Sequence, residues 1–307
     1  MKQAVIDIGS NSLRLTLYAV DEEARFKILF REKIMAGLAG YVEKGRLSQE
    51  GIRCAVSALQ EFQTTLEMLD ISHPAVFATA SLRNIENTQE ALAEIENATG
   101  LSIEILSGEE EAQLGYLGAM EAMDIPEGVF ADIGGASTEV VTFRNGAVEQ
   151  EGSFPVGSLS LYRNCVKKLL PGEGGQKRIR KVISAELSKK LPEGKYTPLI
   201  GVGGTCRAVL KVAQRFYGLP QTQQSVTREQ LDCLCDLLRQ GDKQAIDLIL
   251  RTEPERIHTL IPGILILRQI MAHFQSEQLI VCKYGVREGY LCQKILSKAT
   301  TTPKTEN

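Results

Sequence analysis

The sequence predicts an α/β protein made of two related domains. Segments with strand-like and helix-like apolar periodicity alternate along the chain. One stretch also occurs twice without a gap, because VIDIGSNSLRLTLY at residues 5–18 aligns with FADIGGASTEVVTF at residues 130–143. A repeat that opens each half is typical of a duplicated domain with a cleft where the copies face each other. We therefore expect domains at 1–124 and 125–298 and a disordered tail at 299–307.

The first half is expected to alternate strands with helices. Apolar alternation predicts a hairpin over 3–8 and 13–20. Ser48 is the predicted N-cap of a long helix, and Gly100 is predicted to end another. The other predicted elements are one or two strands in 25–36, a helix up to about Leu69, a strand at 75–80, a helix at 88–99, a strand at 101–107 and a helix at about 108–123.

The second half begins with the same pattern. A hairpin is predicted over 129–148, with Asn145-Gly146 as a turn. The segment 197–216 is predicted to form a strand, a glycine turn and a helix, whereas the glycine-rich PGEGGQK at 171–177 is predicted to be a flexible loop. The rest is predicted to be mostly helical, apart from a strand and turn at 278–285.

Composition and charge argue against several classes of protein. The chain has 307 residues, of which 43% are hydrophobic and 24% charged, and its net charge of −3 provides no basic excess for nucleic acid or a membrane surface. The longest apolar stretch, at 260–267, is too short to cross a bilayer. Seven scattered cysteines without a C-x-x-C pair indicate reduced core thiols. We expect a cytoplasmic protein without a signal peptide and without nucleic-acid or membrane partners.

The repeated D-I-G-x-x-S turn has the chemistry of a phosphate site. In each copy a strand delivers an aspartate, Asp7 or Asp132, to a glycine turn whose backbone N–H groups stay uncovered. Consecutive N–H groups and a hydroxyl form an anion cradle. An aspartate beside a bound phosphate requires a cation, so the pattern predicts Mg²⁺ between them. An ordinary hairpin turn explains either copy alone, and it is the repetition that favours a phosphate site.

A third glycine turn lies in LIGVGGTCRAV. Gly201, Gly203 and Gly204 are predicted to lie between a strand and a helix, with Thr205 as the N-cap. Bare backbone at a helix N-terminus is a natural anion site. A tight packing corner between strand and helix explains the same glycines equally well.

The segment LSGEEEAQLGYLG at 106–118 contains a carboxylate that helix capping does not explain. Ser107 and Glu110 form a predicted capping box, and Glu109 complements the helix dipole. Glu111 instead lies on the predicted half-buried helix face. Beside a phosphate cleft it is a candidate general base for water, and a solvated acidic first turn is the alternative.

Three arginines lie close to these motifs. Arg83 follows a buried strand, Arg287 lies where a helix begins, and Arg14 alternates with leucines on a strand, so it is expected on the opposite face. The guanidinium fork suits phosphate oxygens. An ordinary surface ion pair is the alternative for each arginine taken alone.

Taken in order, DIGSNSLRL, ATASLRNIEN, SGEEEA, DIGGASTE, GVGGTCRAV and YGVREG resemble the exopolyphosphatase / guanosine pentaphosphate phosphohydrolase family over about residues 3–297. The ordered set is specific, although its single pieces are not. That family belongs to the actin, hexokinase and heat-shock ATPase superfamily, so the resemblance implies duplicated actin-like (ribonuclease H-like) domains with an interdomain cleft. The chain resembles the short two-domain members, because it stops before the C-terminal helical domain of the longer ones.

The resemblance implies Mg²⁺-dependent release of the terminal phosphate from inorganic polyphosphate, from guanosine pentaphosphate, or from both. It implies that Glu111 is catalytic, because the catalytic residue of S-G-x-E-E-A is the second glutamate of the pair before alanine. Asp132, helped by Asp7, is the implied metal ligand, and a homodimer is the assembly that the family suggests. The implied phosphate-binding residues are Gly9, Ser10, Asn11, Ser12, Arg14, Arg83, Gly134, Gly135, Ala136, Ser137, Thr138, Gly203, Gly204, Thr205 and Arg287.

One departure from the family pattern suggests alternatives. The second loop usually reads D-I-G-G-G-S, but this chain has Ala136 in place of the third glycine. If that position needs a positive φ or bare backbone, the cradle is strained and a reduced rate is expected. A sensor that binds guanosine tetraphosphate or pentaphosphate with little turnover is therefore the second hypothesis. A kinase of the same superfamily is a third, and it is less favoured because the Glu111 motif and YGVREG match the phosphatases.

Overall fold

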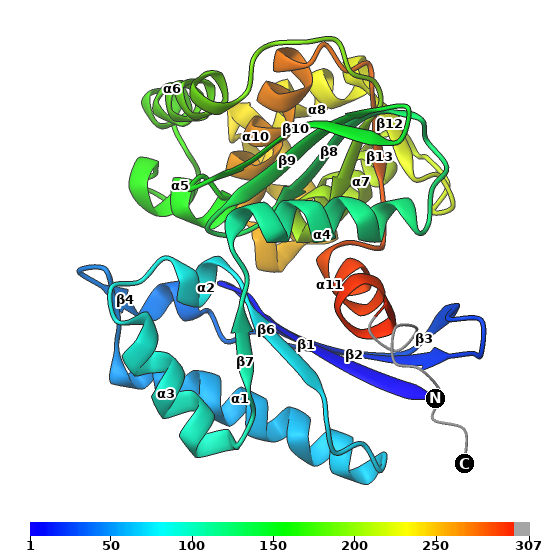
Figure 1. Cartoon of the computed structure of the whole chain (residues 1–307). Helices are drawn as coiled ribbons and strands as arrows, with labels where there is room; N and C mark the ends of the chain where they lie inside the picture. Colours follow the sequence, from blue (N-terminus) through cyan, green and yellow to red (C-terminus); the bar gives the residue numbers. More distant parts are fainter. Residues whose placement is uncertain (298–307) are drawn as a thin grey trace. The chain divides into compact units, whose positions relative to one another are not determined.

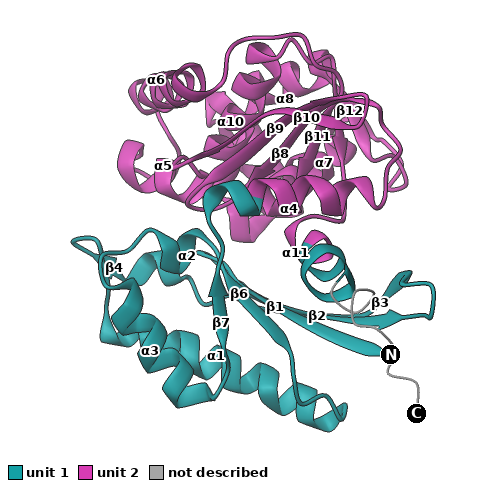
Figure 2. Ribbon diagram, in the orientation of Figure 1, with its two compact units in different colours: residues 1–111, 290–307 teal, residues 112–289 magenta. Residues whose placement is uncertain are grey.

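A computed structural model of the chain describes residues 1–297, which form two compact units. Unit 1 comprises residues 1–111 together with the segment from residue 290 onward, and unit 2 comprises residues 112–289 (Figure 2). The sequence-based boundary between 124 and 125 lies thirteen residues beyond the change of unit at 111/112. The predicted disordered tail lies outside the described residues.

Unit 1 is built on a five-stranded sheet with the order β3-β2-β1-β6-β7. The first three strands are antiparallel, whereas β1, β6 and β7 run parallel. Its elements are β1 (Lys2–Ile8), β2 (Leu13–Val20), β3 (Phe26–Ile34), η1 (Leu38–Tyr41), β4 (Val42–Glu43), β5 (Arg46–Leu47), α1 (Gln49–Met68), β6 (Ala75–Ala78), α2 (Ala80–Arg83), α3 (Thr88–Thr99), β7 (Ile103–Ile105) and η3 (Leu291–Leu296). Figure 1 shows α1 and α3 together on one face of this sheet.

Unit 2 has a six-stranded sheet with the order β10-β9-β8-β11-β13-β12. Its elements are β8 (Glu127–Ile133), β9 (Thr138–Arg144), β10 (Ala147–Phe154), α5 (Ser158–Cys165), α6 (Glu173–Lys190), β11 (Leu199–Val202), α7 (Gly203–Tyr217), β12 (Ser225–Thr227), α8 (Arg228–Gln240), α9 (Lys243–Thr252), η2 (Pro254–Arg256), α10 (Leu260–His273) and β13 (Gln278–Val281). The chain passes from one unit to the other within two further helices, α4 (Gly108–Met120) and α11 (Val286–Tyr290).

The two sheets share one topology, which confirms the predicted duplicated actin-like (ribonuclease H-like) α/β fold. In each unit a three-stranded antiparallel meander leads into parallel strands, and β12 is an extra antiparallel edge strand of unit 2. The repeat also holds in register. Asp7 pairs with Arg14 across the β1–β2 hairpin, and Asp132 pairs with Glu139 at the same place in the β8–β9 hairpin.

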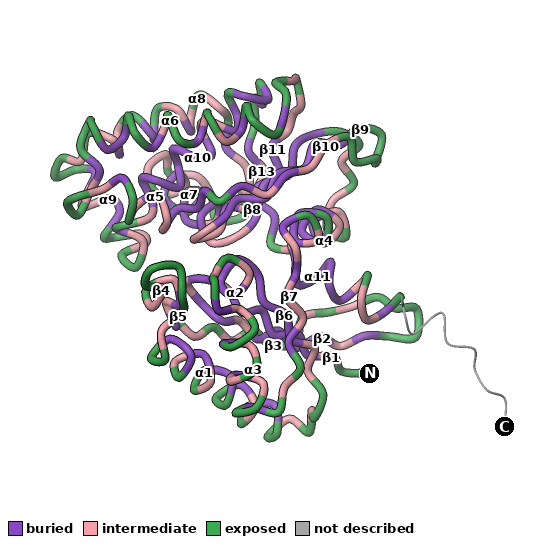
Figure 3. The backbone as a smooth tube through the Cα atoms, turned by 60° about the vertical axis from the view of Figure 1, so that its left-hand side comes forward, coloured by how far each residue is buried: buried purple, intermediate pink, exposed green. Residues whose placement is uncertain are grey.

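In each unit, strand alternation places the aspartate on the sheet face opposite the residues that pack into the main core of that unit. In unit 1, Ile6 and Ile8 face the core under α1 and α3, so Asp7 points to the other face. In unit 2, Ala131 and Ile133 face the larger core, so Asp132 lies on the face that α4 covers. Figure 3 colours the backbone by how far each residue is buried.

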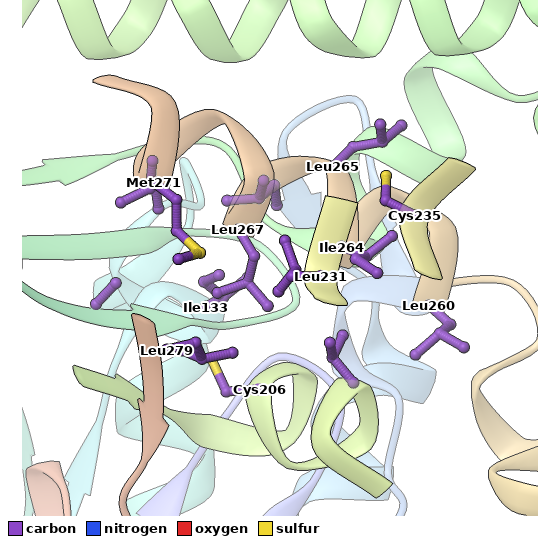
Figure 4. Close-up of a cluster of buried hydrophobic side chains, with 14 of the residues drawn as sticks. Ile133, Cys206, Leu231, Cys235, Leu260, Ile264, Leu265, Leu267, Met271 and Leu279 are labelled. Carbon is purple, nitrogen blue, oxygen red and sulfur yellow. The ribbon is translucent and has the colours of Figure 1, made fainter. Parts of the chain in front are cut away.

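The larger core of unit 2 explains the most apolar stretch of the sequence. Residues 260–267 form the first half of α10 and are buried (Figure 4). Ile264 and Leu267 are completely buried there among Cys206, Leu231 and other side chains. Within residues 1–297, no helix has the length and apolar character that crossing a membrane requires.

Most predicted elements are confirmed, and the segment 25–36 forms one strand, β3, within the predicted one or two. Two predictions are wrong in detail. The predicted loop at 171–177 is helical from Glu173, because Gln176 donates hydrogen bonds to the carbonyls of Pro171 (2.9 Å) and Arg239 (2.8 Å). Thr205 is not an N-cap, since α7 already begins at Gly203.

Candidate functional site

The corner of unit 1 is the turn between β1 and β2. The Gly9 N–H group donates to the Ser12 carbonyl over 3.2 Å and closes the turn. The Ser10 carbonyl accepts from Ala39 N–H at 2.9 Å, so the segment around η1 supports the turn from outside. Asp7 is buried at the end of β1, as are the Ser10 and Ser12 side chains. Asp7 and the turn at residues 9–12 therefore lie next to each other, as the sequence analysis expects.

The corner of unit 2 has the same closing bond, in which Gly134 N–H donates to the Ser137 carbonyl over 3.0 Å. The start of α5 packs against this turn, because Ser160 N–H and Leu159 N–H both donate to the Gly135 carbonyl at 2.9 Å. Gly157 allows that approach, since a Cβ there would lie 2.4 Å from the Gly135 carbonyl oxygen. The corner is thus held rigidly from one side.

Two predicted phosphate-binding hydroxyls point inward. Thr138 donates to the Val156 carbonyl over 2.5 Å and is buried. Thr205 is also buried, and its Oγ1 donates to Ser158 Oγ over 3.5 Å. These side chains support the fold of unit 2, which leaves only their backbone groups for a ligand.

Ala136, the departure from the family pattern, does not have a positive φ. The residue is half-buried, and its carbonyl accepts from Ser160 Oγ over 3.5 Å. The backbone strain expected for an alanine at this position is therefore absent.

The third glycine turn lies against the Asp132 corner. Gly203 has a φ of +83°, and a Cβ added there would lie 2.4 Å from Oδ1 of Asp132. A Cβ at Gly204 would lie 2.1 Å from a guanidinium nitrogen of Arg256. Gly203 is thus favoured by its positive φ and by the nearby Asp132 carboxylate, and Gly204 leaves room for the Arg256 guanidinium. Unit 2 brings Asp132, the start of α7 and Arg256 together.

Two residues beside this corner were missed by the sequence analysis. Burial lowers the pKa of Arg256, whose guanidinium lies against the glycine turn; its segment, PERIHTL, carries no motif. Glu139 is 1% exposed, lies opposite Asp132 in the hairpin and accepts from Ser153 Oγ over 2.8 Å. The signal for Glu139 was present, because the second repeat has an acid where the first has Arg14.

In unit 1, the buried Glu111 carboxylate forms an ion pair with the half-buried Arg83 guanidinium. Nη1 of Arg83 lies 2.8 Å from Oε2 of Glu111 and also donates to the Leu106 carbonyl over 2.9 Å. Glu111 is 7% exposed. Ser81, on the same short helix as Arg83, donates to the Ile8 carbonyl over 2.5 Å. This contact joins the Glu111 pair to the end of the strand that carries Asp7.

The capping box that distinguishes Glu111 from its neighbours is confirmed. Ser107 N–H donates to Glu110 Oε2 over 2.9 Å, and Glu110 N–H donates to Ser107 Oγ over 3.0 Å. Glu109 is exposed to solvent. Of the three glutamates, only Glu111 is buried, which agrees with its predicted place on the half-buried helix face and not with a solvated first turn.

The two remaining arginines lie in different units. Arg14 is half-buried on β2, beside Asp7 in the register. Arg287 is 9% exposed on α11, next to Glu288, which accepts from Gly285 N–H over 2.9 Å. Over residues 1–297, no three His, Cys, Asp or Glu side chains cluster in a way that would hold a metal ion by themselves.

Comparison with known proteins provides the family context for this geometry. The sequence model of the Ppx/GppA phosphatase family matches residues 16–298. Exopolyphosphatase 1 of Mycobacterium tuberculosis is 23% identical, with 100% of this chain and 92% of that protein aligned. A bifunctional 3-dehydroquinate synthase/phosphatase of Fusobacterium nucleatum is 25% identical over 96% of this chain and 47% of its own length.

Solved structures agree with this match. The Aquifex aeolicus member of the Ppx/GppA family has a TM-score of 0.79 at 27% identity, and the alignment covers 97% of this chain and 98% of that one. An exopolyphosphatase from Cytophaga hutchinsonii has a TM-score of 0.82 at 20% identity, with coverage of 97% and 98%. The second similarity supports the fold alone.

Proposed function

The chain belongs to the Ppx/GppA phosphatase family, and on that premise we propose that it releases the terminal orthophosphate from inorganic polyphosphate. Relatives aligned over nearly their whole length are named exopolyphosphatases. The observation that carries the proposal is the buried Glu111 carboxylate, held by Arg83 close to the glycine corner of unit 1.

Glu111 is the general base of the proposed reaction. Its carboxylate accepts a proton from water as the oxygen attacks the terminal phosphorus, and the bond from that phosphorus to the bridging oxygen breaks. The shortened chain and orthophosphate then leave. Arg83 holds the carboxylate in one orientation through the 2.8 Å contact, so it acts as a positioning residue.

The glycine corners are the proposed phosphate-binding elements. Backbone N–H groups of residues 10–12 and 135–137, which the closing bonds of the two turns do not use, face anionic oxygens in this proposal, because the hydroxyls of Thr138 and Thr205 are used inside the fold. Arg14 and Arg287 add positive charge in the units to which they belong, and Arg256 adds it at the turn of Gly203.

The residues at the corners fit a magnesium ion. Mg²⁺ in phosphate sites usually takes one or two carboxylates and completes its shell with phosphate oxygens and water. Asp132 has the buried Glu139 beside it in the register, and Asp7 occupies the equivalent place in unit 1. We propose that Asp132 holds the ion, which would supply positive charge against the bound phosphates.

Phosphate release from long polyphosphate tests the proposal. The Glu111→Gln variant is expected to lose about 10²–10⁴-fold in kcat, because the amide cannot accept the proton. Glu109→Gln removes an exposed charge from the same helical turn and is expected to retain the wild-type rate. Chelation of Mg²⁺ should abolish release, and added Mg²⁺ should restore it. A folded Glu111→Gln protein with near-normal turnover would exclude the assigned role.

Guanosine pentaphosphate is a second proposed substrate, because corners that contact only phosphoryl groups do not select against a nucleotide. Parallel assays of phosphate release from both compounds define the preference. Calorimetric titration separates a sensor from an enzyme, since a sensor binds the nucleotide without releasing phosphate. The negative φ of Ala136 removes the strain on which the sensor hypothesis rested.

A further inference from the structure

Unit 2 contains a cavity of about 580 Å³ along one side of α7, away from any residue assigned above. Its wall is formed by α7, by the loop that follows this helix, by the end of α9 and by Lys283 after β13. A cavity of this size accommodates a small-molecule ligand. The position of α7 in unit 2 can be followed in Figure 1.

Five of the residues that line the cavity are basic and none is acidic. These are Arg207, Lys211, Arg215, Arg251 and Lys283. The first three are spaced by four residues on α7, so they share one helix face over a rise of about 12 Å. No Asp or Glu occurs in the sequence between Glu193 and Glu229, although the chain as a whole has a net charge of −3. The basic cavity is therefore a local feature and not a consequence of composition.

Most of this positive charge is not neutralised by the protein. Lys211 pairs with Glu253, its Nζ lying 2.6 Å from Oε1. Arg215, Arg251 and Lys283 are exposed, and within residues 1–297 no carboxylate lies at ion-pair distance from them. Like charges brought together around one cavity repel each other unless an anion compensates them. A solvated basic helix face would be the ordinary explanation, but it does not account for cations from three separate segments around one hollow.

The other polar groups of the cavity favour phosphate over a nucleobase. Gln214 donates to the Gln223 carbonyl over 2.8 Å, and Gln224 donates to the Gln221 carbonyl over 3.0 Å, so these amide donors already have partners. No aromatic side chain lines the described cavity on which a base could stack. The cations remain as the groups that a ligand would meet.

The helix connects the cavity to the Asp132 corner. It begins at Gly203, which lies against Asp132, and Arg207 follows one turn later. Burial raises the pKa of the intervening Cys206 thiol, the charge of Asp132 raises it further, and Arg207 lowers it. The charges of Asp132 and Arg207 are therefore both close to Cys206. The basic face of α7 thus begins beside the Asp132 corner and extends away from it along the helix.

We propose that this cavity, which we call the α7 groove, binds a run of linked phosphoryl groups at a distance from the bond that is cleaved. The assignment rests on the proposed function, because it makes the groove the place where the remainder of a polyphosphate chain is held. It predicts that the protein binds long chains more tightly than short ones.

Charge neutralisation in the groove tests the inference. The groove variant combines Arg215→Gln, Arg251→Gln and Lys283→Gln, which are exposed side chains. The control variant combines Lys177→Gln, Lys181→Gln and Lys189→Gln on α6, which removes the same charge from exposed positions of the same unit. The measurement is equilibrium binding of end-labelled long polyphosphate, followed by steady-state kinetics with long polyphosphate, tripolyphosphate and guanosine triphosphate.

The groove variant is expected to bind long polyphosphate about tenfold more weakly, with a shallower salt dependence, and the control to stay within about twofold of wild type. The KM for long chains should rise by the same factor, whereas kcat and the kinetics with tripolyphosphate should not change. Equal binding of long polyphosphate by the groove and control variants would overturn the inference, as would a KM that rises for guanosine triphosphate and not for long polyphosphate. A wild-type protein that binds long chains yet releases no phosphate would contradict the proposed function alone.

Discussion

Gly203 illustrates how a single residue shapes the corner of unit 2. Its φ of +83° lies in the left-handed region, where a side chain is strained, and its missing Cβ leaves room for Oδ1 of Asp132. Gly218 provides a natural comparison at the other end of the same helix. It has a φ of +65°, but a Cβ there would meet nothing within 4 Å.

We expect Gly203→Ala and Gly218→Ala to destabilise the protein similarly, by about 1 kcal/mol, because both impose a positive φ on alanine. Only Gly203→Ala should also lower phosphate release, by tenfold or more, since its methyl group displaces Asp132. Thermal unfolding and phosphate-release assays on the pair measure the two effects. Equal activity of the two variants would mean that the position of Asp132 does not matter for the reaction.

At the scale of elements, the start of α4 combines a structural carboxylate with the candidate base. The hydrogen bond from Ser107 N–H lowers the pKa of Glu110, and the neighbouring Lys294, whose Nζ lies 3.2 Å away, adds to the effect against the cost of burial. A carboxyl group whose pKa is lowered by folding stabilises the protein when it is ionised. That stabilisation is fully present at pH values above the pKa of Glu110 in the unfolded protein. It is lost as the pH falls through the lower pKa of Glu110 in the folded protein.

Glu110→Gln is therefore expected to destabilise the protein at pH 7 by less than about 1 kcal/mol, because the group is partly exposed and its ion pair is screened. The difference from wild type should shrink as the pH falls through the lowered folded-state pKa, and vanish once Glu110 is protonated in both states. Urea unfolding over a series of decreasing pH values measures it, with Glu109→Gln as the matched control. A difference that is independent of pH would show that the amide disturbs the cap sterically.

For the whole molecule, the main finding is that unit 1 is not continuous in sequence. Tyr290, at the end of α11, stacks on Phe77 with ring centroids 4.8 Å apart and donates to Glu104 Oε2 over 2.6 Å. Lys294 adds an ion pair to Glu104 at 2.9 Å. The last described helix therefore covers the sheet face of unit 1 that α1 and α3 leave open.

Tyr290→Ala is expected to cost about 3–5 kcal/mol, because it removes a buried ring from this face. Tyr290→Phe keeps the ring and should cost about 1 kcal/mol for the lost hydrogen bond. Chemical denaturation measures the two values, and hydrogen exchange should become faster in β6 and β7 of the alanine variant. Two variants of equal stability would indicate that the ring does not support unit 1.

The sequence by itself determined the elements, the duplication and the pair of corners. Caps at Ser48 and Ser107 and the repeat of Asp7 at Asp132 are local patterns, and a local pattern is read directly from the order of residues. The capping box also singled out Glu111, because it accounted for Glu110 but not for Glu111, and the family resemblance then made Glu111 the candidate base, a role that stays a prediction.

Only the tertiary structure decided which distant groups meet. It placed Arg256 against the turn of Gly203, turned the hydroxyls of Thr138 and Thr205 inward and returned Tyr290 to unit 1. It also gathered Arg207, Arg251 and Lys283 around one groove. These contacts depend on the packing of segments far apart in the chain, and no local periodicity or cap carries that information.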